Sequence, residues 1–253
     1  MALEVRLCTL SLEKEKIRNN VITKGQRLLM EIAIRLICLL MGYLLGLIQT
    51  SYIYGKLHGI DIREYGSGNA GTTNALRVLG KKAGIIVLLG DFLKAAVACL
   101  IARYIGISFF PDIIYPMVLW AGFGVVIGHN YPFYMNFKGG KGIAATAGII
   151  FGVLDWRIMV ICLLSFIITV VLTRYVSLGS LIVVTLFFLS FLCLGLLGLI
   201  KEPITGMEFS GNELIESYVL IFLFGCLAFF RHKANIIRLK NGEENKIFSN
   251  SSK

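Results

Sequence analysis

The amino-acid sequence predicts an all-α fold, a polytopic membrane protein with about seven transmembrane helices. Three observations lead to this prediction. Of the 253 residues, 57% are hydrophobic and 16% are charged, and the mean hydropathy of +0.78 is far above that of an average soluble domain. The apolar residues are gathered in long runs, and the polar segments between these runs are rich in glycine and basic side chains.

Apolar runs that approach the ~20 residues needed to cross a bilayer recur along the chain. We expect crossings at residues 32–54, 83–106, 113–130, 143–154, 158–173, 178–200 and 214–230. The two short runs leave alternatives open, because they could form one interrupted helix or a hairpin that does not cross. One interrupted helix would reverse the orientation of everything after residue 173, whereas a hairpin would keep it.

Seven crossings sort the polar segments onto two faces of the membrane. Segments 55–82, 131–142, 174–177 and 231–253 then share one face, which holds most of the lysines and arginines next to the spans. The opposite face holds mainly acidic side chains, namely Asp112, Asp155, Glu202, Glu208 and Glu213. Because basic loops stay on the cytoplasmic side, we expect the basic face to be cytoplasmic.

The net charge of +10 fits the same account. Excess lysine and arginine in a membrane protein reflect the inside-positive bias and contact with anionic lipid, and no soluble module remains to bind nucleic acid. The six cysteines lie mostly inside apolar runs and form no CxxC pair, so neither a metal site nor a disulfide framework is expected.

Three parts of different character follow one another along the chain. Residues 1–30 are polar, carry charges of both signs and lack the pattern of a signal peptide, so we expect a poorly ordered extension or an interfacial helix. Residues 31–248 are expected to form the membrane domain. Residues 249–253 are a short C-terminal tail.

The first polar cluster, GSGNAGTTNALRVLG at residues 66–80, indicates anion capture. Its glycines permit sharp turns and a close approach of the backbone to a ligand. Hydroxyl and amide side chains supply hydrogen-bond donors, and an arginine can form paired hydrogen bonds to a phosphate. The candidate substrate-binding residues here are Ser67, Gly68, Asn69, Gly71, Thr73, Asn74 and Arg77.

The second cluster, GHNYPFYMNFKGGKG at residues 128–142, brackets Gly139 and Gly140 with Lys138 and Lys141. Such a backbone can fold into a nest of amides around an oxyanion. The segment lacks the first glycine and the final Ser or Thr of a nucleotide P-loop, so an ATP site is not expected. The alternative is a basic interfacial loop that touches lipid phosphates.

The third cluster, RHKANIIRLKNGEENK at residues 231–246, follows the last span. Helical spacing places Arg231, Asn235 and Arg238 on one face, with His232 beside them. The alternative is an ordinary basic segment that ends a membrane span, which would show the same residue pattern. Ser177 precedes a further span, where it could meet an anion or simply cap the helix.

Two ionisable residues, Asp91 and Lys94, lie inside the second span, three positions apart on one helical side. Charged groups within a membrane helix are costly and usually face a partner or a cavity. We expect the two side chains to pair with each other and to support the loops. Direct contact with a ligand is the alternative.

The sequence contains no GxSxG elbow, no HExxH and no HxxxxD pattern. The polar residues therefore suit a reaction in which alignment of an already activated substrate supplies much of the rate. A transporter or flippase for a phosphorylated solute is the rival hypothesis, because basic residues near glycine breaks suit anion translocation too. Turnover in detergent, without a sealed compartment, distinguishes the two.

The three clusters, in this order between hydrophobic spans, resemble the signature loops of the acyl-phosphate-dependent glycerol-3-phosphate acyltransferases of bacteria, the PlsY family. The resemblance covers roughly residues 38–248 and includes KLHGIDIREY and GDFLKAAVA. It implies a seven-span enzyme of the bacterial inner membrane with a cytoplasmic active site. The enzyme would transfer a fatty acyl group from acyl phosphate to the sn-1 hydroxyl of glycerol 3-phosphate, giving lysophosphatidic acid and phosphate.

The resemblance implies no acyl-CoA, carrier-protein donor, metal, nucleotide or other cofactor. The partners would be glycerol 3-phosphate, acyl phosphate and membrane lipids, and we expect a monomer. The extension before residue 30 has no expected counterpart in the family, and Ala144, Ala145 and Glu243 also depart from its usual pattern.

Residue by residue, the resemblance implies that Ser67, Asn69, Arg77, Lys138 and Lys141 bind the two phosphate groups. His232 and Asn235 match positions that hold glycerol 3-phosphate or orient its hydroxyl. The candidate catalytic residues are His232, Asn235 and Lys141, and the substrate-binding candidates outside the first cluster are Lys138, Gly139, Gly140, Ser177 and Arg238.

The expected mechanism gives the cations and the histidine different tasks. Lys141, Arg77 and the glycine-loop amides would neutralise charge that develops on the leaving phosphate. Either His232 or a substrate phosphate oxygen would accept the proton of the attacking hydroxyl, because the basic neighbours of His232 disfavour a protonated ring.

Overall fold

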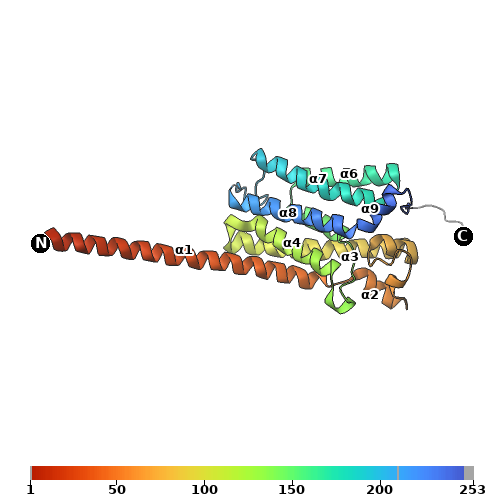
Figure 1. Ribbon diagram of the computed structural model, residues 1–253, viewed down its shortest axis with the longest axis horizontal. Coiled ribbons are helices and arrows are strands. Elements are labelled where there is room, and N and C mark those ends of the chain that lie inside the picture. Colours follow the sequence, from red (N-terminus) through yellow and green to blue (C-terminus); the bar gives the residue numbers. More distant parts are fainter. Residues whose placement is uncertain (1, 210, 248–253) are drawn as a thin grey trace.

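The computed structural model is a bundle of antiparallel helices with one helix that extends far beyond it (Figure 1). It describes the backbone of residues 2–209 and 211–247 and the side chains from residue 23 on, so the predicted tail 249–253 lies outside the described residues. The α-helices are α1 (Ala2–Gly46), α2 (Thr50–Leu57), α3 (Thr72–Phe109), α4 (Ile114–Asn130), α5 (Ile143–Val153), α6 (Trp156–Thr173), α7 (Val176–Leu196), α8 (Asn212–Arg231) and α9 (Lys233–Lys240).

Six described segments are long and apolar enough to cross a membrane: Thr23–Leu57, Thr72–Phe109, Pro111–Met135, Trp156–Thr173, Val176–Leu196 and Asn212–Arg231. The prediction of an all-α polytopic membrane protein is confirmed. The seventh expected crossing, residues 143–154, is the short apolar helix α5. Its 11 residues rise only about 16 Å, roughly half the thickness of a hydrocarbon core.

A buried ion pair completes the end of this short helix. The Arg103 guanidinium donates to the carbonyl oxygens of Gly152 and Val153 at 3.0 and 2.9 Å, and it also pairs with Glu202. Both charged side chains are fully buried. Because the last carbonyls of a helix lack intrahelical partners and are costly to leave unpaired in an apolar interior, this arginine allows α5 to end there.

α5 and α6 are separate helices that run in opposite directions. Lys141, just before α5, contacts Asn235, and the carbonyl of Arg174, just after α6, accepts a hydrogen bond of 2.8 Å from the amide of Ile247. The chain therefore returns to the end of the bundle from which α5 began. The alternative of one interrupted helix is wrong, and the predicted sorting of the later segments is kept.

The first expected span, residues 32–54, lies within the described segment Thr23–Leu57, but the structure adds a break inside it. α1 ends at Gly46, and α2 begins at Thr50 after a short break. Glycines let α1 pack closely on α4: a Cβ at Gly124 would lie 2.1 Å from the carbonyl oxygen of Leu39, and one at Gly46 would lie 2.4 Å from that of Val125.

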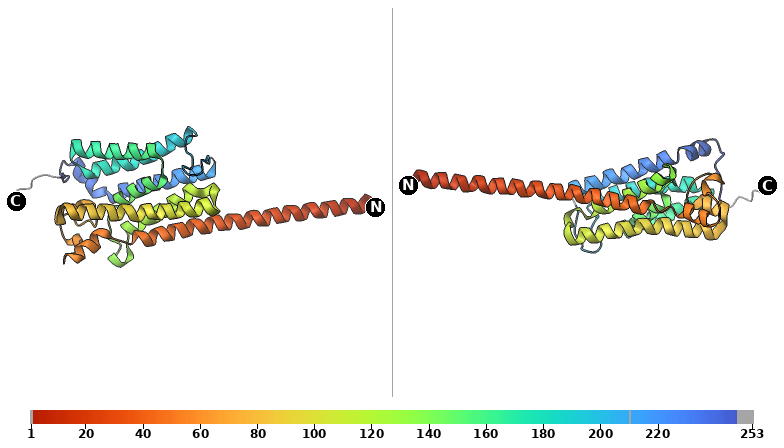
Figure 2. Two further views of the ribbon diagram at one scale, coloured as in Figure 1. Left: turned by 180° about the vertical axis from the view of Figure 1, so that it is seen from behind. Right: turned by 90° about the horizontal axis from the view of Figure 1, so that it is seen from below.

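The N-terminal segment continues α1 as one helix from Ala2, and Figure 2 shows it projecting beyond the bundle at the end opposite the C-terminus. For residues 1–30 we expected either a poorly ordered extension or an interfacial helix. The described backbone of this segment is helical. The boundary at residue 30 between this segment and the membrane domain stays a prediction.

Candidate active site at the loop end of the bundle

The first glycine-rich segment is shaped by Asn74. Its Oδ1 accepts a hydrogen bond from the amide of Ser67 at 2.8 Å, and its Nδ2 donates to the carbonyl oxygens of Ile62 and Tyr65, both at 3.0 Å. Gly66 adopts a φ of +61°, and a Cβ there would lie 2.3 Å from Asn74 Oδ1. Asn74, predicted as a substrate contact, therefore uses its side chain to fold the loop.

The second half of this segment is helical, although the sequence suggested a loop throughout. Gly71 is the N-cap of α3, so Thr73 and Arg77 lie on the first two turns of that helix, which kinks at Gly80. The first amides of a helix have no intrahelical partner and favour an anion. The segment thus presents a helix N-terminus, with Arg77 exposed one turn further on.

The predicted nest of amides at Gly139 and Gly140 is wrong. The Gly139 amide donates to the carbonyl of Asn130 at 3.2 Å, and the Gly140 amide donates to that of His129 at 3.1 Å. Both glycine carbonyls accept from the Arg231 guanidinium, at 3.0 and 2.8 Å. These two glycines therefore fix the loop against α4 and the third cluster, and their amides are not available to an oxyanion.

Lys141 is linked to a carboxylate of the third cluster through Asn235. The Lys141 ammonium donates to Asn235 Oδ1, and Asn235 Nδ2 donates to Glu244 at 2.6 Å. The same carboxylate accepts from Ser177 at 2.9 Å and from Arg238 at 2.8 Å. Four predicted site residues are thus joined directly or through Glu244, which was not among the predicted site residues.

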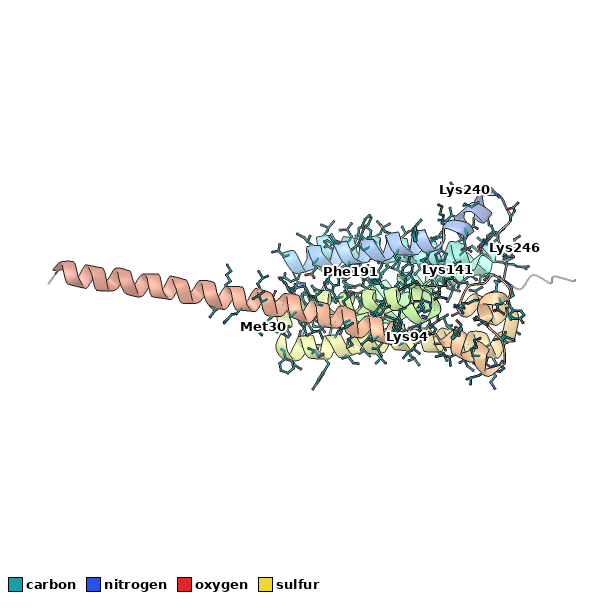
Figure 3. All side chains as sticks on the ribbon, turned by 60° about the horizontal axis from the view of Figure 1, so that its bottom comes forward. Met30, Lys94, Lys141, Phe191, Lys240 and Lys246 are labelled. Carbon is teal, nitrogen blue, oxygen red and sulfur yellow. The ribbon has the colours of Figure 1, made fainter. Side chains whose placement is uncertain are left out.

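Burial and neighbouring cations control the charge of Lys141. Burial lowers the pKa of Lys141 to about 8, the Glu244 carboxylate opposes this change, and the guanidinium groups of Arg238, Arg231 and Arg77 add to it. Arg77, which belongs to the first cluster, is therefore close enough to act on the lysine of the second. Figure 3 shows Lys141 inside the bundle near the end that carries Lys246.

His232 is a neutral, oriented imidazole. Burial lowers the pKa of His232 to about 4, and the Lys141 ammonium acts in the same direction. Its Nδ1 lies 2.8 Å from the carbonyl oxygen of Ala228, so Nδ1 carries the proton and donates it. The lone pair on Nε2 is then left to accept a hydrogen bond.

The remaining predicted residues lie at the rim of the site. Lys138, Ser67 and Gly68 are exposed, and Asn69 is half-buried. Arg231, like Glu244, was missing from the predicted set. The available signal for Glu244 was an acidic residue within a basic segment, and for Arg231 it was the helical face shared with Asn235. No group of side chains suited to a metal ion is present in the part of the chain that the structure describes.

The fold and the candidate site together define a class: a polytopic helical membrane protein with a cluster of basic and amide side chains at one end. The family model for glycerol-3-phosphate acyltransferase matches residues 36–242. A glycerol-3-phosphate acyltransferase of Clostridioides difficile is 40% identical over 227 residues, which cover 86% of this chain and 98% of the relative. The chain therefore belongs to the glycerol-3-phosphate acyltransferase family and is a membrane acyltransferase.

Two solved structures have the same fold. Both are crystal structures of PlsY (YgiH), an integral membrane glycerol 3-phosphate acyltransferase, in a glycerol 3-phosphate form and a lysophosphatidic acid form. They are 32% and 31% identical to this chain, with TM-scores of 0.70 and 0.67. Each comparison covers 84% of this chain and 95% of the solved one, so the resemblance to the PlsY family is confirmed.

Proposed function

We propose that the chain transfers a fatty acyl group from acyl phosphate to the sn-1 hydroxyl of glycerol 3-phosphate, giving lysophosphatidic acid and inorganic phosphate. The observation that carries this proposal is the convergence on Lys141, whose half-buried ammonium contacts Asn235 of the third cluster and is affected by the charge of Arg77 in the first. Two phosphate-bearing substrates need such a set of cations. The names of the relatives and of the solved structures support the same substrate.

The reaction forms one ester bond and breaks one anhydride bond. The hydroxyl oxygen attacks the acyl carbon, and phosphate leaves with the electron pair of the broken C–O bond. Lys141 and Arg77 stabilise the negative charge on that phosphate, and the N-terminus of α3 adds a positive dipole. Because the Lys141 pKa is about 8, its ammonium form predominates at neutral pH.

His232 orients the attacking hydroxyl. Its Nε2 lone pair accepts the hydroxyl hydrogen bond, while the bond from Nδ1 to Ala228 holds the ring. With a pKa of about 4 the ring is a poor general base. The proton therefore passes to a phosphate oxygen of the acyl phosphate, and that phosphate leaves as hydrogen phosphate.

The proposed location is the bacterial inner membrane, with the site open to the cytoplasm. The loops around the site carry Lys138, Arg238 and Lys240, whereas the opposite end carries Asp112 and Glu213. This asymmetry supports the orientation through the inside-positive bias. Glycerol 3-phosphate would enter from water, and acyl phosphate from the inner leaflet.

Turnover by purified protein in detergent tests the proposal. With acyl phosphate and glycerol 3-phosphate present, we expect phosphate release that requires both substrates. Lys141→Ala should abolish it, whereas Lys201→Ala, which removes an exposed ion pair with Glu208 at the opposite end, should not change it. Absence of chemistry in detergent, combined with uptake of a phosphorylated solute by sealed proteoliposomes, would favour the transporter hypothesis instead.

A further inference from the structure

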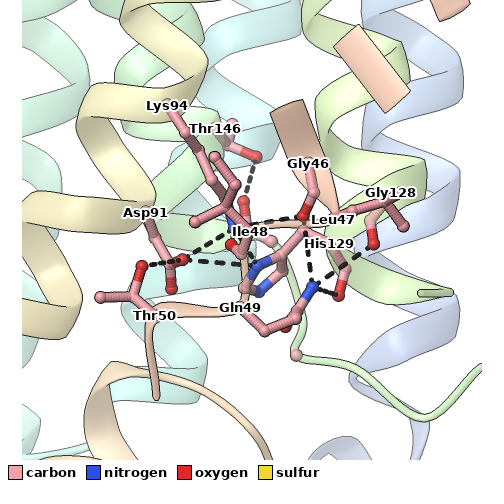
Figure 4. Close-up of polar contacts among 12 residues, drawn as sticks. Gly46, Leu47, Ile48, Gln49, Thr50, Asp91, Lys94, Gly128, His129 and Thr146 are labelled. Carbon is pink, nitrogen blue, oxygen red and sulfur yellow. Dashed lines mark hydrogen bonds and ion pairs between the residues drawn. The ribbon is translucent and has the colours of Figure 1, made fainter. Parts of the chain in front are cut away.

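A buried ammonium lies below the loops, within the bundle. Lys94 Nζ is 2.8 Å from Asp91 Oδ1 and 2.6 Å from the carbonyl oxygen of Ile48, in the break between α1 and α2. It is also 2.9 Å from Nδ1 of His129. Figure 4 shows these contacts, together with the hydrogen bond of 3.2 Å from Thr50 to Asp91. The predicted pairing of Asp91 with Lys94 is confirmed.

This contact selects one tautomer of His129. A lysine ammonium has three donors and no lone pair, so the facing Nδ1 must accept. A ring protonated on both nitrogens would place two donors against each other. The ring is therefore neutral, and its proton is on Nε2, the nitrogen on the far side from Lys94.

Nε2 of His129 faces the glycine loop. A Cβ at Gly140 would lie 2.1 Å from this nitrogen and 2.6 Å from the carbonyl oxygen of Ala70. The Gly140 amide is bonded to the His129 carbonyl, and its own carbonyl to Arg231. Gly140 is thus the point where the first cluster, the second cluster and the third cluster touch.

The His129 ring is enclosed by its neighbours. Only 4% of its side-chain surface is exposed, and its Nε2 end fills the space beside the Gly140 backbone. A shift of this ring would therefore be felt by the loop that carries Lys141.

We propose that His129 is a positioning residue for the acyl transfer, an inference that rests on the proposed function. Its ring, held from inside the membrane domain by Lys94, sets the place of the Gly140 backbone and thereby of the neighbouring Lys141 ammonium. A displacement of about 1 Å at such a group can lower a rate about 100-fold. The buried charges of α3 therefore act on the reaction through His129.

Two substitutions test the roles of the two ring nitrogens of His129 separately. His129→Gln retains an N–H near the place of Nε2, whereas His129→Asn retains an acceptor for Lys94 but leaves the space below Gly140 empty. Tyr134→Phe is the matched control, because it removes a hydrogen bond of 2.6 Å to the Leu47 carbonyl in the same region without touching Gly140. Each purified variant is assayed for phosphate release in detergent.

We expect kcat/KM to fall about 10-fold or more in His129→Asn, mainly through kcat, because Lys141 acts on charge that develops in the transition state. His129→Gln should stay within about 3-fold of the wild type, and Tyr134→Phe should be unchanged. Equal losses in the Asn and Gln variants, or no loss in either, would overturn the proposal. An inactive wild-type protein would instead count against the proposed function.

Nitrogen-15 NMR of the wild-type protein tests the geometry even if a variant does not fold. With labelled histidine, the His129 signals should report a neutral ring whose proton is on Nε2. A proton on Nδ1 would contradict the contact with the Lys94 ammonium and overturn the inference, whatever the turnover of the variants. His232, whose proton is expected on Nδ1, provides the internal comparison for the opposite tautomer.

Discussion

The Ser177 hydroxyl donates a hydrogen bond of 2.9 Å to Glu244, although 67 residues separate the two in the chain. The same carboxylate binds Asn235 and Arg238, so one acidic side chain joins the start of α7 to the segment after α8. Through Asn235 this arrangement reaches the Lys141 ammonium. The geometry of the site therefore depends on Glu244 as much as on the basic residues around it.

Glu244→Gln should move the alkaline limb of the pH–rate profile to lower pH. The wild-type activity requires the ammonium form of Lys141, which is lost as pH rises through about 8. Glu244 raises the Lys141 pKa, so its neutralisation lowers that pKa further and the cation disappears at a lower pH. The measurement is kcat/KM between pH 6 and 9, and an unshifted or alkaline-shifted limb would contradict the assignment.

His232→Ala should keep measurable turnover, whereas Arg77→Ala should lose most of it. The histidine orients a hydroxyl, while the arginine stabilises charge that develops on phosphate, and an electrostatic contribution of this kind is worth about 100-fold or more. Because the His232 pKa is about 4, the wild-type profile should also show no acidic limb near pH 6.5. A limb there that vanished in His232→Gln would make the histidine the general base.

Arg103→Met should destabilise the protein by about 3 to 5 kcal/mol, because it leaves the Glu202 carboxylate buried and unpaired. The double substitution Arg103→Met with Glu202→Leu should lose less stability than Arg103→Met alone. Thermal unfolding in detergent measures both variants. A single variant as stable as the wild type would show that the pair does not hold the end of α5.

Gly124→Ala should destabilise the packing of α1 on α4. The added Cβ would lie 2.1 Å from the Leu39 carbonyl and 2.7 Å from the Tyr43 amide, and neither backbone atom can move without separating the helices. Gly225→Ala is the matched control, because no atom lies within 4 Å of its added Cβ and alanine favours a helix. Equal melting temperatures for the two variants would contradict the close contact.

The sequence predicted the features that hydropathy reports directly. Long apolar runs located the spanning helices, and the glycine-rich and basic segments between them indicated the candidate site. The break after Gly46 was not predicted, because the Lys94 ammonium that satisfies its carbonyls comes from another helix. The short α5 likewise depends on Arg103, 49 residues before Gly152.

Side-chain roles within the site were harder to predict than its position. Asn74 and Gly140 have the residue types of a ligand site, yet their hydrogen bonds fold the loops. His129 was not singled out in the sequence, because the ammonium that orients it lies 35 residues earlier in the chain. Spacing along a sequence reports which face a residue shares, and it does not report the partner that a distant segment supplies.

The central claim is that the three clusters form one site for acyl transfer around Lys141. Its most direct test measures inorganic phosphate and lysophosphatidic acid together, from purified protein in detergent with acyl phosphate and glycerol 3-phosphate. The account predicts equal amounts of the two products from the wild type and neither from Lys141→Ala. Phosphate released without lysophosphatidic acid, or full turnover by Lys141→Ala, would contradict it.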